Sequence, residues 1–443
     1  MPRKIRRRPP PSGVFSANVT GLAHDGRGIA HIDSKAVFIQ GALPDEQVQF
    51  HYTATHSQFD EGVCDQVIQA AADRVEPRCA HFGVCGGCSL QHLAPERQIE
   101  YKQDWLLDNL SRIGKVQPAE ILPALTGLHW AYRYKARLGV KHVIKKERVL
   151  VGFRERESAF LADLRRCEIL HPTLGPLLPE LAELIGSLSI YNRLPQIEVA
   201  AGDNALALSF RVLDLPTEQD RAALTAFAER HSIQVYLQPK GPATTTLLWP
   251  QQAELTYQLP EFELELAFLP YHFTQVNPAL NRQMVSRAVA LLDVQAGERV
   301  LDLFCGLGNF TLPLARRAAE VVGIEGEPSL VEWARRNAVR NAVHNARFVT
   351  ADLAAEDEHN PVWGQNYDKV LLDPPRSGAL AVLPRLARCQ ARRIVYVSCH
   401  PATLARDAGE LVHSHGYRLL QAGVMDMFPH TAHVESIAVF EHR

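Results

Sequence analysis

The pattern of apolar and polar residues changes character along the chain. Up to about residue 68, apolar and polar residues alternate with a period of two in short segments separated by Gly, Pro and Asp turns. The segments are residues 14–19, 36–39, 46–52 and 62–68. Alternation of this kind predicts strands with one buried face, and several such strands in so short a stretch predict a small closed β-barrel.

A longer repeat follows at residues 95–113, which we expect to form an amphipathic helix. A proline stands in its first turn, and Ile99, Leu106, Leu110 and Ile113 recur on one face. Gly114 is expected to end the helix at the C′ position. Between about 130 and 269 strand patterns dominate, with helical interruptions near residues 177–188 and 218–231.

From residue 271 the pattern becomes a helix at 279–292 and then repeats of strand, turn and helix, which predict an α/β fold with a parallel sheet. The expected organisation is a basic arm (1–13), a barrel (14–72), a β-rich central domain (73–270) and the α/β domain (271–443). The helix at 95–113 belongs to the central domain in sequence, but its apolar face could pack on the α/β domain.

Composition adds limits to this picture. A chain of 443 residues exceeds one ordinary core, and with 46% hydrophobic and 22% charged residues it is globular. No apolar run is long enough to span a membrane. The basic residues 3–8 lead into prolines rather than an apolar segment, which argues against a secretory signal and favours the cytoplasm. The net charge of −2 hides this cationic arm, which is suited to contact phosphates.

Eight cysteines in such a chain suggest metal binding or catalysis rather than disulfides. Three of them form a C-x5-C-x2-C run among glycines: Cys79, Cys85 and Cys88. Zinc would need a nearby fourth ligand, for which His81 and His92 are candidates, whereas an iron–sulfur cubane would take a fourth cysteine such as Cys167. The spacing favours a [4Fe–4S] cluster over zinc and over unligated core cysteines.

A glycine-rich turn follows the buried strand that begins at residue 299. Gly306 and Gly308 permit close backbone approach to a ligand, but the third glycine of a dinucleotide fingerprint is replaced by Thr311. The turn also carries Asp302, an acidic residue that would repel a pyrophosphate but suits a cationic ligand. S-adenosylmethionine carries a sulfonium and an ammonium group, and it fits this turn.

Acidic residues also end the next strands. Glu325 stands nineteen residues after Gly306, where its carboxylate can accept hydrogen bonds from ribose hydroxyls. Asp352 ends the third strand at a place suited to the adenine edge, and Asp373 ends the fourth. Because the carboxyl ends of parallel strands share one edge of the sheet, these acids together predict a methyltransferase that uses S-adenosylmethionine.

Asp373 opens an Asp-Pro-Pro sequence, which raises the alternative of an enzyme that methylates amino groups. Those enzymes place an aromatic residue next, whereas Arg376 stands here. The following strand, residues 394–398, ends at Cys399, which could be a small buried residue or a nucleophile at the ligand-binding edge.

Methylation at C5 of a pyrimidine needs such a cysteine. A thiolate that adds to C6 turns the ring into an enolate that can attack a methyl group, and a base must then remove the C5 proton. We assign the base to Glu435, with His430 and His433 as alternatives.

Several motifs together resemble the RNA uracil-C5 methyltransferase family: FTQVN, VLDLFCGLGNFTLPLA, LLDPPR, YVSCHPATLARD and MDMFPHTAHVES. Residues 21–30 and 37–46 resemble a TRAM domain, an RNA-gripping oligonucleotide-binding (OB) type barrel. The barrel and the CAHFGVCGGC run are most similar to the branch that modifies large-subunit (23S) ribosomal RNA. A purely structural barrel remains an alternative.

The resemblance implies site residues by position. Cys399 would be the nucleophile and Glu435 the base. The cofactor positions fall on Gln275, Phe304, Asn309, Glu325, Asp352 and Asp373, beside Asp302 and Gly306 of the glycine turn. The cluster ligands fall on Cys79, Cys85, Cys88 and Cys167. One departure is His400, where the family usually has asparagine, and an imidazole there could perturb the thiol pKa or face away.

The resemblance implies a class I Rossmann-like methyltransferase domain that acts on a single-stranded or flipped uridine of 23S ribosomal RNA. We expect a monomer with no DNA or membrane partner. Alternatives are another ribosomal RNA site, transfer RNA, or a non-catalytic RNA-binding assembly factor, against which the presence of both Cys399 and Glu435 argues. Residues 130–137 interleave aromatic and cationic side chains, as base stacking or an ordinary solvated strand face would.

Overall fold

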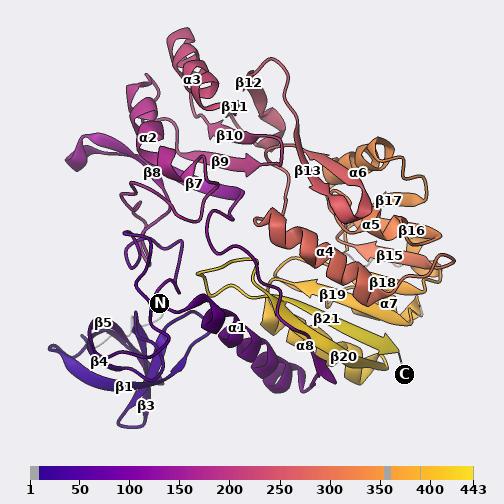
Figure 1. Ribbon diagram of the computed structural model, residues 1–443, viewed down its shortest axis with the longest axis horizontal. Coiled ribbons are helices and arrows are strands. Elements are labelled where there is room, and N and C mark those ends of the chain that lie inside the picture. Colours follow the sequence, from indigo (N-terminus) through magenta and orange to yellow (C-terminus); the bar gives the residue numbers. More distant parts are fainter. Residues whose placement is uncertain (1–8, 354–360, 390, 443) are drawn as a thin grey trace, which may run out of the picture.

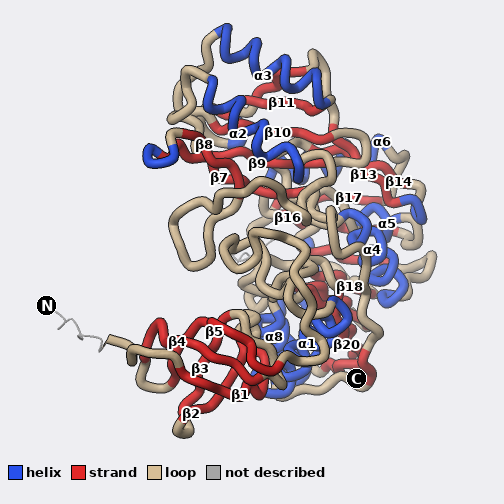
Figure 2. Tube along the Cα trace, turned by 60° about the vertical axis from the view of Figure 1, so that its left-hand side comes forward, coloured by secondary structure: helices blue, strands red, loops and turns tan. Residues whose placement is uncertain are grey.

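The computed structural model describes residues 9–353, 361–389 and 391–442. A small barrel lies at one end, a mixed sheet with its own helices at the other, and a large α/β sheet beside both (Figures 1 and 2). The basic stretch 3–8 of the expected arm lies outside the described residues. No helix in the described part of the chain is long and apolar enough to cross a membrane.

The predicted N-terminal barrel is confirmed, and it closes in the strand order β1-β2-β3-β5-β4. Its strands are β1 (Phe15–Leu22), β2 (Gly28–Ile32), β3 (Lys35–Gln40), β4 (Gln47–Thr55) and β5 (Phe59–Gln69). The sequence pattern missed β2, which is short and begins at a glycine. A Cβ atom at Gly28 would lie 2.8 Å from the Ala42 carbonyl oxygen, so the tight closure of the barrel explains this glycine.

The central region forms a six-stranded sheet in the order β12-β11-β10-β9-β7-β8. Its strands are β7 (Lys135–Val143), β8 (Arg148–Gly152), β9 (Gln196–Ala201), β10 (Leu206–Arg211), β11 (Ile233–Gln238) and β12 (Thr246–Trp249). Both predicted helices are confirmed, as α2 (Leu178–Ser187) and α3 (Glu218–His231).

One of the aromatic residues before β7, Tyr132, faces inward, so the interpretation of this segment as a base-stacking surface is wrong for that residue. Tyr132 is buried, and its hydroxyl donates to the Pro429 carbonyl oxygen at 2.9 Å. The Trp130 ring stacks on His430 with centroids 3.9 Å apart. These contacts tie the central region to the loop before the last strand.

The C-terminal sheet has eight strands in the order β17-β16-β15-β18-β19-β21-β20-β6, and β17 to β19 are parallel. The strands are β6 (Glu120–Ile121), β15 (Arg299–Leu303), β16 (Glu320–Glu325), β17 (Ala346–Thr350), β18 (Lys369–Leu372), β19 (Arg393–Ser398), β20 (Tyr417–Met425) and β21 (Glu435–His442). The helices are α4 (Pro278–Leu292), α5 (Thr311–Ala315), α6 (Pro328–Arg340), α7 (Leu383–Arg388) and α8 (Pro401–Ser414). A separate hairpin joins β13 (Leu255–Leu259) to β14 (Leu264–Phe268). The α/β class predicted from the strand–turn–helix repeats is therefore confirmed.

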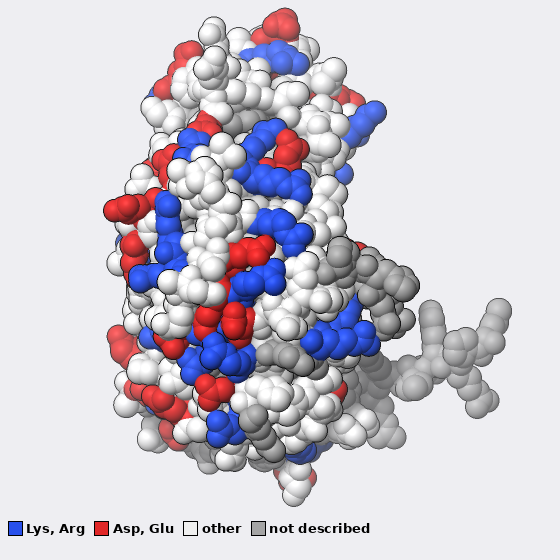
Figure 3. Space-filling view, turned by 90° about the vertical axis from the view of Figure 1, so that its right-hand side faces the viewer, with Lys and Arg blue, Asp and Glu red and all other residues white. Residues whose placement is uncertain are grey.

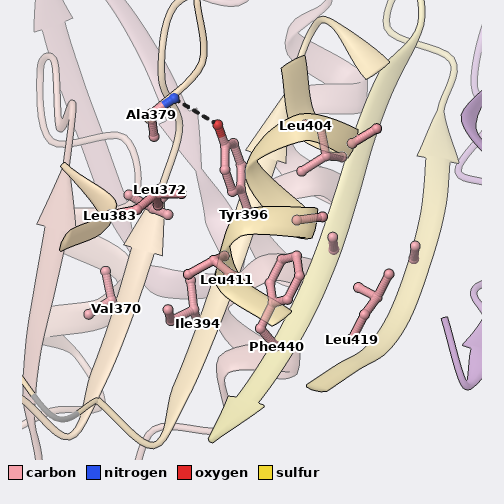
Figure 4. Close-up of a cluster of buried hydrophobic side chains, with 14 of the residues drawn as sticks. Val370, Leu372, Ala379, Leu383, Ile394, Tyr396, Leu404, Leu411, Leu419 and Phe440 are labelled. Atoms are coloured by element: carbon pink, nitrogen blue, oxygen red, sulfur yellow. Dashed lines mark hydrogen bonds between the residues drawn. The ribbon is translucent and has the colours of Figure 1, made fainter. Parts of the chain in front are cut away.

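The central strands of this sheet are largely apolar because helices pack on both faces. Ile394, Tyr396 and Phe440 are fully buried and pack with Leu404 and Leu411 of α8 (Figure 4). On the face shown in Figure 3, cationic and anionic side chains are interspersed.

The helix predicted at 95–113 is α1 (Pro95–Asn109), extended by a π-helical turn, Leu110–Gly114. The prediction that Ile113 lies on the buried face is wrong, since it is 49% exposed, because the wider turn rotates it away from the core. The left-handed residue after the helix is Lys115 rather than Gly114. Gly114 instead permits contact with α8, because a Cβ atom there would lie 2.3 Å from the Ala405 carbonyl oxygen.

A buried ion pair fastens α1 to the C-terminal sheet. The Lys102 ammonium is fully buried and lies 2.6 Å from an Asp426 carboxylate oxygen. It also donates to the Phe428 carbonyl oxygen at 3.0 Å. Burial of two charges is tolerated here because each has a hydrogen-bonding partner.

Replacement of Lys102 by Met should lower the free energy of unfolding by about 3–5 kcal/mol, because it leaves Asp426 buried without its counter-charge. The double variant Lys102→Met/Asp426→Leu should recover much of this loss. Urea denaturation followed by circular dichroism measures both changes. The matched control Lys141→Met, at an exposed position of β7, should change the value by less than about 0.5 kcal/mol. If Lys102→Met lowered the free energy of unfolding by as little as this control, the stabilising role assigned to the ion pair would be contradicted.

Candidate active site

The expected site residues lie along the carboxyl edge of the parallel strands, where the strand order reverses about β15. Leu303 of β15 pairs with Leu372 of β18, which pairs in turn with Tyr396 of β19. The residues that follow these strands, among them Asp373 and Cys399, therefore lie side by side. Ligands of open α/β sheets bind at such an edge.

The glycine turn after β15 is shaped around Glu325. Phe304, Gly306 and Gly308 all have positive φ angles (66°, 52° and 91°), so the backbone turns sharply there. The Gly306 amide donates to one Glu325 carboxylate oxygen at 3.1 Å, and the Glu327 amide donates to the other at 3.0 Å. Both bonds fix the carboxylate beside the turn.

Asp302 lies within β15, not in the turn, and it is fully buried. Thr311 donates its hydroxyl to Asp302 Oδ2 at 2.5 Å, while Oδ1 has no hydrogen-bonding partner among the described residues. Burial raises the pKa of Asp302 to about 8. An unpaired buried acceptor beneath the turn fits a ligand that brings cationic or N–H donors.

Two expected cofactor residues have structural partners. The Asn309 amide pairs in both directions with Asn281 of α4, at 3.0 Å each way, and accepts from the Tyr257 hydroxyl at 3.0 Å. Gln275 lies in the loop before α4, which is held to the central region by the Tyr134 amide donating to the Val276 carbonyl oxygen at 2.8 Å. Asp352 is exposed, two residues beyond β17. The structure thus brings most of the expected residues to the carboxyl edge of the sheet. The Asn309 side chain joins the glycine turn to α4 and to Tyr257.

Cys399 lies between β19 and α8, and the antiparallel pairing of Ser398 with Ser436 sets it beside Glu435. Burial raises the pKa of the Cys399 thiol, and the nearby carboxyl groups of Glu435 and Asp373 raise it further. Burial and the charge of Asp373 also raise the pKa of Glu435 well above its ordinary value. Burial alone raises the pKa of Asp373 to about 7.

Arg376 supplies the opposing charge, and the sequence analysis did not assign it a role. Arg376 and Cys399 line the same cavity, and the charge and hydrogen bonding of the guanidinium act against the raised pKa of that thiol. The guanidinium also lies 3.0 Å from His433 Nδ1. The only signal in the sequence was a cation close behind Asp373 in the same motif.

The three histidines near the site differ in their contacts. His430 is buried, its Nδ1 lies 3.3 Å from the Gln98 amide nitrogen, and its ring stacks on Trp130, so it does not reach Cys399. Burial and Arg376 lower the pKa of His433 to about 4. Of the three groups considered as the base, Glu435 is therefore the one that the strand pairing sets beside the thiol.

His400 begins α8, and its Nδ1 accepts a hydrogen bond from the Thr403 amide at 3.3 Å. Asparagine is among the preferred residues at this capping position. The imidazole therefore provides the same kind of acceptor as the usual asparagine. Burial and the charge of Arg376 lower the pKa of His400, which favours the unprotonated ring that this cap requires.

A cavity of about 720 Å³ opens onto the thiol. It lies between the barrel, α1 and the start of α8, and its wall includes His24, Phe38, Trp105, Arg112, Arg376 and Cys399. The cavity therefore gives a solvent-connected route from the barrel surface to the thiol.

A second site lies around the cysteine run. All four expected cysteines, Cys79, Cys85, Cys88 and Cys167, line one cavity. Gln91 lines it as well, and its side-chain oxygen accepts from the Cys79 amide at 3.1 Å, while the Gly87 amide donates to the Cys85 sulfur at 3.4 Å. His81 also lines this cavity, but its Nε2 accepts from the Arg165 amide at 3.0 Å, so it is not free as a metal ligand.

Within the described residues, no group of three or more His, Cys, Asp or Glu side chains is close enough to hold a metal ion as the side chains stand. In a cubane each thiolate binds a different iron, so its sulfurs lie farther apart than those around one zinc ion. Four thiols that line one cavity are a donor set that fits such a cluster.

The sequence matches two protein-family models. Residues 177–443 match the tRNA (Uracil-5-)-methyltransferase model, and residues 14–63 match the TRAM domain model. The TRAM match covers most of the closed barrel.

Curated relatives match over nearly the full length. One from Nitrosococcus oceani, a 23S rRNA (uracil(1939)-C(5))-methyltransferase RlmD, is 55% identical over 98% of both chains. A protein of the same description from Methylococcus capsulatus is 53% identical over 100% of both chains.

Among solved structures, the tRNA (uracil-54, C5)-methyltransferase of Pyrococcus abyssi in complex with S-adenosyl-L-homocysteine has the same fold. It covers 96% of this chain and 99% of its own, with a TM-score of 0.74 and 23% identity. The family model and the full-length relatives agree on one assignment. The chain belongs to the S-adenosylmethionine-dependent RNA uracil-C5 methyltransferase family.

Proposed function

We propose that this protein methylates C5 of a uridine in 23S ribosomal RNA through a covalent bond between Cys399 and C6 of the base. The observation that carries the proposal is the grouping of the Cys399 thiol with Glu435 and Arg376 at the edge where the cofactor is expected. Full-length relatives named for uracil 1939 support that nucleotide as the target. A ribosomal RNA substrate is consistent with action in the cytoplasm.

The thiolate would supply the activation that C5 lacks. Addition of the Cys399 sulfur to C6 leaves an enolate whose C5 carbon is nucleophilic, and this carbon forms the new bond to the methyl group. S-adenosylmethionine, when bound, supplies that methyl group in electrophilic form. Arg376 favours the thiolate, since a cation next to a thiol stabilises its ionised form.

Glu435 would then accept the C5 proton, and the C6–sulfur bond would break to release the methylated base and the thiolate. A buried carboxylate next to another acid is a stronger base than one in water, which suits this step. The oxygen that takes the proton belongs to the first residue of β21, so its position is set by a regular strand.

We assign the cofactor to the carboxyl edge of β15 to β18. Glu325 is suited to the ribose hydroxyls and Asp352 to the adenine, with Asp302 and Asp373 facing the cationic part of the ligand. Gly306 and Phe304 would shape the turn against it, and Asn309 and Gln275 would close the side towards α4. These assignments rest on strand position and on the unpaired Asp302 oxygen.

The RNA would approach over the barrel (14–72) and the central domain (73–270) and insert a flipped uridine into the cavity of the α/β domain (271–443). His24 and Phe38 of the barrel and Cys399 of the α/β domain share that cavity, which supports a joint binding surface. Every assigned catalytic group comes from one chain, so we propose that a monomer is active.

The four cysteines would hold a [4Fe–4S] cluster with a structural role. A cubane would join the segment with Cys79, Cys85 and Cys88 to the later segment with Cys167. The adjoining Ser89 and Leu90 amides both donate to the His430 carbonyl oxygen, at 2.9 and 3.0 Å. The cluster would thereby steady the loop that leads to Glu435.

The Cys399→Ala variant should lose methyl transfer by about 10⁴-fold or more, because C5 is no longer activated. With RNA containing 5-fluorouridine and S-adenosylmethionine, the natural protein should form a stable protein–RNA adduct, since fluorine cannot leave C5 as a proton does. Denaturing electrophoresis measures the adduct. Cys64→Ser in the barrel is the control and should still form it. An adduct formed by Cys399→Ala would exclude this mechanism.

The Glu435→Gln variant should accumulate a covalent protein–RNA complex on ordinary uridine, with turnover reduced by about 10²–10⁴-fold. The amide cannot accept the C5 proton, so the thiolate is not released. Electrophoresis of the complex and release of methylated RNA measure the two effects. Glu410→Gln, at a half-buried position of α8, should behave as the natural protein. Normal turnover in Glu435→Gln together with its loss in His433→Ala would move the base to His433.

Protein purified without oxygen should contain about four iron and four sulfide per chain. Cys167→Ser should lower the iron content and the absorbance of the cluster, while Cys64→Ser should not. Iron and sulfide analysis gives the readout. Zinc in the absence of iron would refute the cluster assignment, and so would an unchanged iron content in Cys167→Ser.

A further inference from the structure

We propose that Asp407 is a positioning residue that fixes Arg376 against the Cys399 thiol, because its carboxylate anchors the turn at residues 374–379 to helix α8. The inference rests on the proposed role of Cys399 as the nucleophile. Asp407 contacts neither the thiol nor the cavity, so its action is through Arg376.

The Asp407 carboxylate is fully buried and accepts hydrogen bonds at both oxygens. Oδ2 accepts from the Ala379 amide at 2.6 Å and from the Tyr396 hydroxyl at 2.7 Å. Oδ1 accepts from Arg406 Nε at 2.8 Å and Nη2 at 2.7 Å. Figure 4 shows the Tyr396 hydroxyl pointing to the Ala379 amide, so the strand β19, the helix and the turn meet at one point.

Two further bonds from α8 hold the same turn. Thr403 donates its hydroxyl to the Arg376 carbonyl oxygen at 3.2 Å, and Arg406 Nη2 donates to the Ser377 carbonyl oxygen at 2.9 Å. Gly378 has a φ of 81°, and a Cβ atom there would lie 2.6 Å from both Arg406 Nη2 and Asp407 Oδ2. The turn is therefore pressed directly against the side chains that anchor it.

This anchoring matters because Arg376 is exposed at the surface of the turn, where a long side chain has many conformations. The attraction between a guanidinium and a thiolate weakens as their separation grows. Cys399 immediately precedes the capped first turn of α8, and Asp407 lies two turns farther along the same helix. One rigid element thus fixes both the sulfur and the backbone that carries the arginine.

Arg376 also reaches His433 Nδ1 at 3.0 Å, on the segment that leads to Glu435. Displacement of the turn would therefore disturb both sides of the site. A purely stabilising Asp407 would have no such effect, because it would change the stability of the fold without changing the thiol.

The test is the pH dependence of Cys399 alkylation by iodoacetamide in the full-length protein, quantified on the peptide that contains Cys399. Arg376→Gln should move the alkylation midpoint to higher pH, and a midpoint higher by about one pH unit means about tenfold less thiolate at neutral pH. Asp407→Asn should move it in the same direction, with at least about a threefold lower rate at neutral pH. Tyr396→Phe, which removes one donor and keeps the ring, should move the midpoint less far in the same direction.

Two controls separate positioning from general stability. The double variant Asp407→Asn/Arg376→Gln should move the midpoint no farther than Arg376→Gln alone. Asp220 is a buried acid with a similar set of donors, Ser189 and Thr217, in the central region. Asp220→Asn should lower the melting temperature and leave the alkylation profile unchanged.

In methyl transfer, Asp407→Asn should lower kcat more than it raises KM.

The inference would be overturned if the alkylation profile were unchanged in both Asp407→Asn and Tyr396→Phe, even if their melting temperatures were lower. An unchanged profile in Arg376→Gln would also overturn it, while adduct formation that still depends on Cys399 would leave the proposed function intact. An adduct formed by Cys399→Ala would instead remove the proposed function itself.

Discussion

The loop between β20 and β21 is held in place by residues that lie more than 290 positions earlier in the chain. Lys102 binds Asp426 within the core, and the Gln98 side-chain oxygen accepts a hydrogen bond from the His430 amide at 2.8 Å. The short strand β6 pairs with β20 at the edge of the same sheet. The N-terminal half therefore supplies the edge strand of the C-terminal sheet. It also holds the loop that leads to Glu435.

This arrangement creates an electrostatic conflict at the thiol. The carboxyl groups of Glu435 and Asp373 favour a protonated Cys399, whereas Arg376 favours the thiolate. Partial burial of the thiol strengthens each of these effects. The Arg376 guanidinium, on an exposed turn, sets the balance between the thiol and the thiolate. Helix α8 fixes that turn through Asp407, Thr403 and Arg406. Helix α8 thereby fixes the Cys399 sulfur, the histidine that caps the helix and the guanidinium that favours the thiolate.

Much of the fold and of the edge of the sheet could be predicted from local patterns. The helix positions in the central region and the α/β repeats follow from periodicity, which is a short-range property. Other features required contacts between distant segments. Ile113 is exposed because the π-helical turn redirects it, and Asp302 is buried beneath the glycine turn that it was expected to join. His400 departs from the family pattern in sequence, but its Nδ1 performs the capping that asparagine would perform.

The sequence by itself determined which groups end the parallel strands, because strand direction places every carboxyl end at one edge. It thus determined that Asp373 and Cys399 lie at the same edge of the sheet, the edge that is expected to hold the cofactor. Only the tertiary structure decided how that thiol is controlled, because Arg376, Asp407 and Lys102 act through contacts that no local pattern encodes. Hydrogen bonds and ion pairs between remote segments depend on their distance in space, and packing of the whole chain sets that distance.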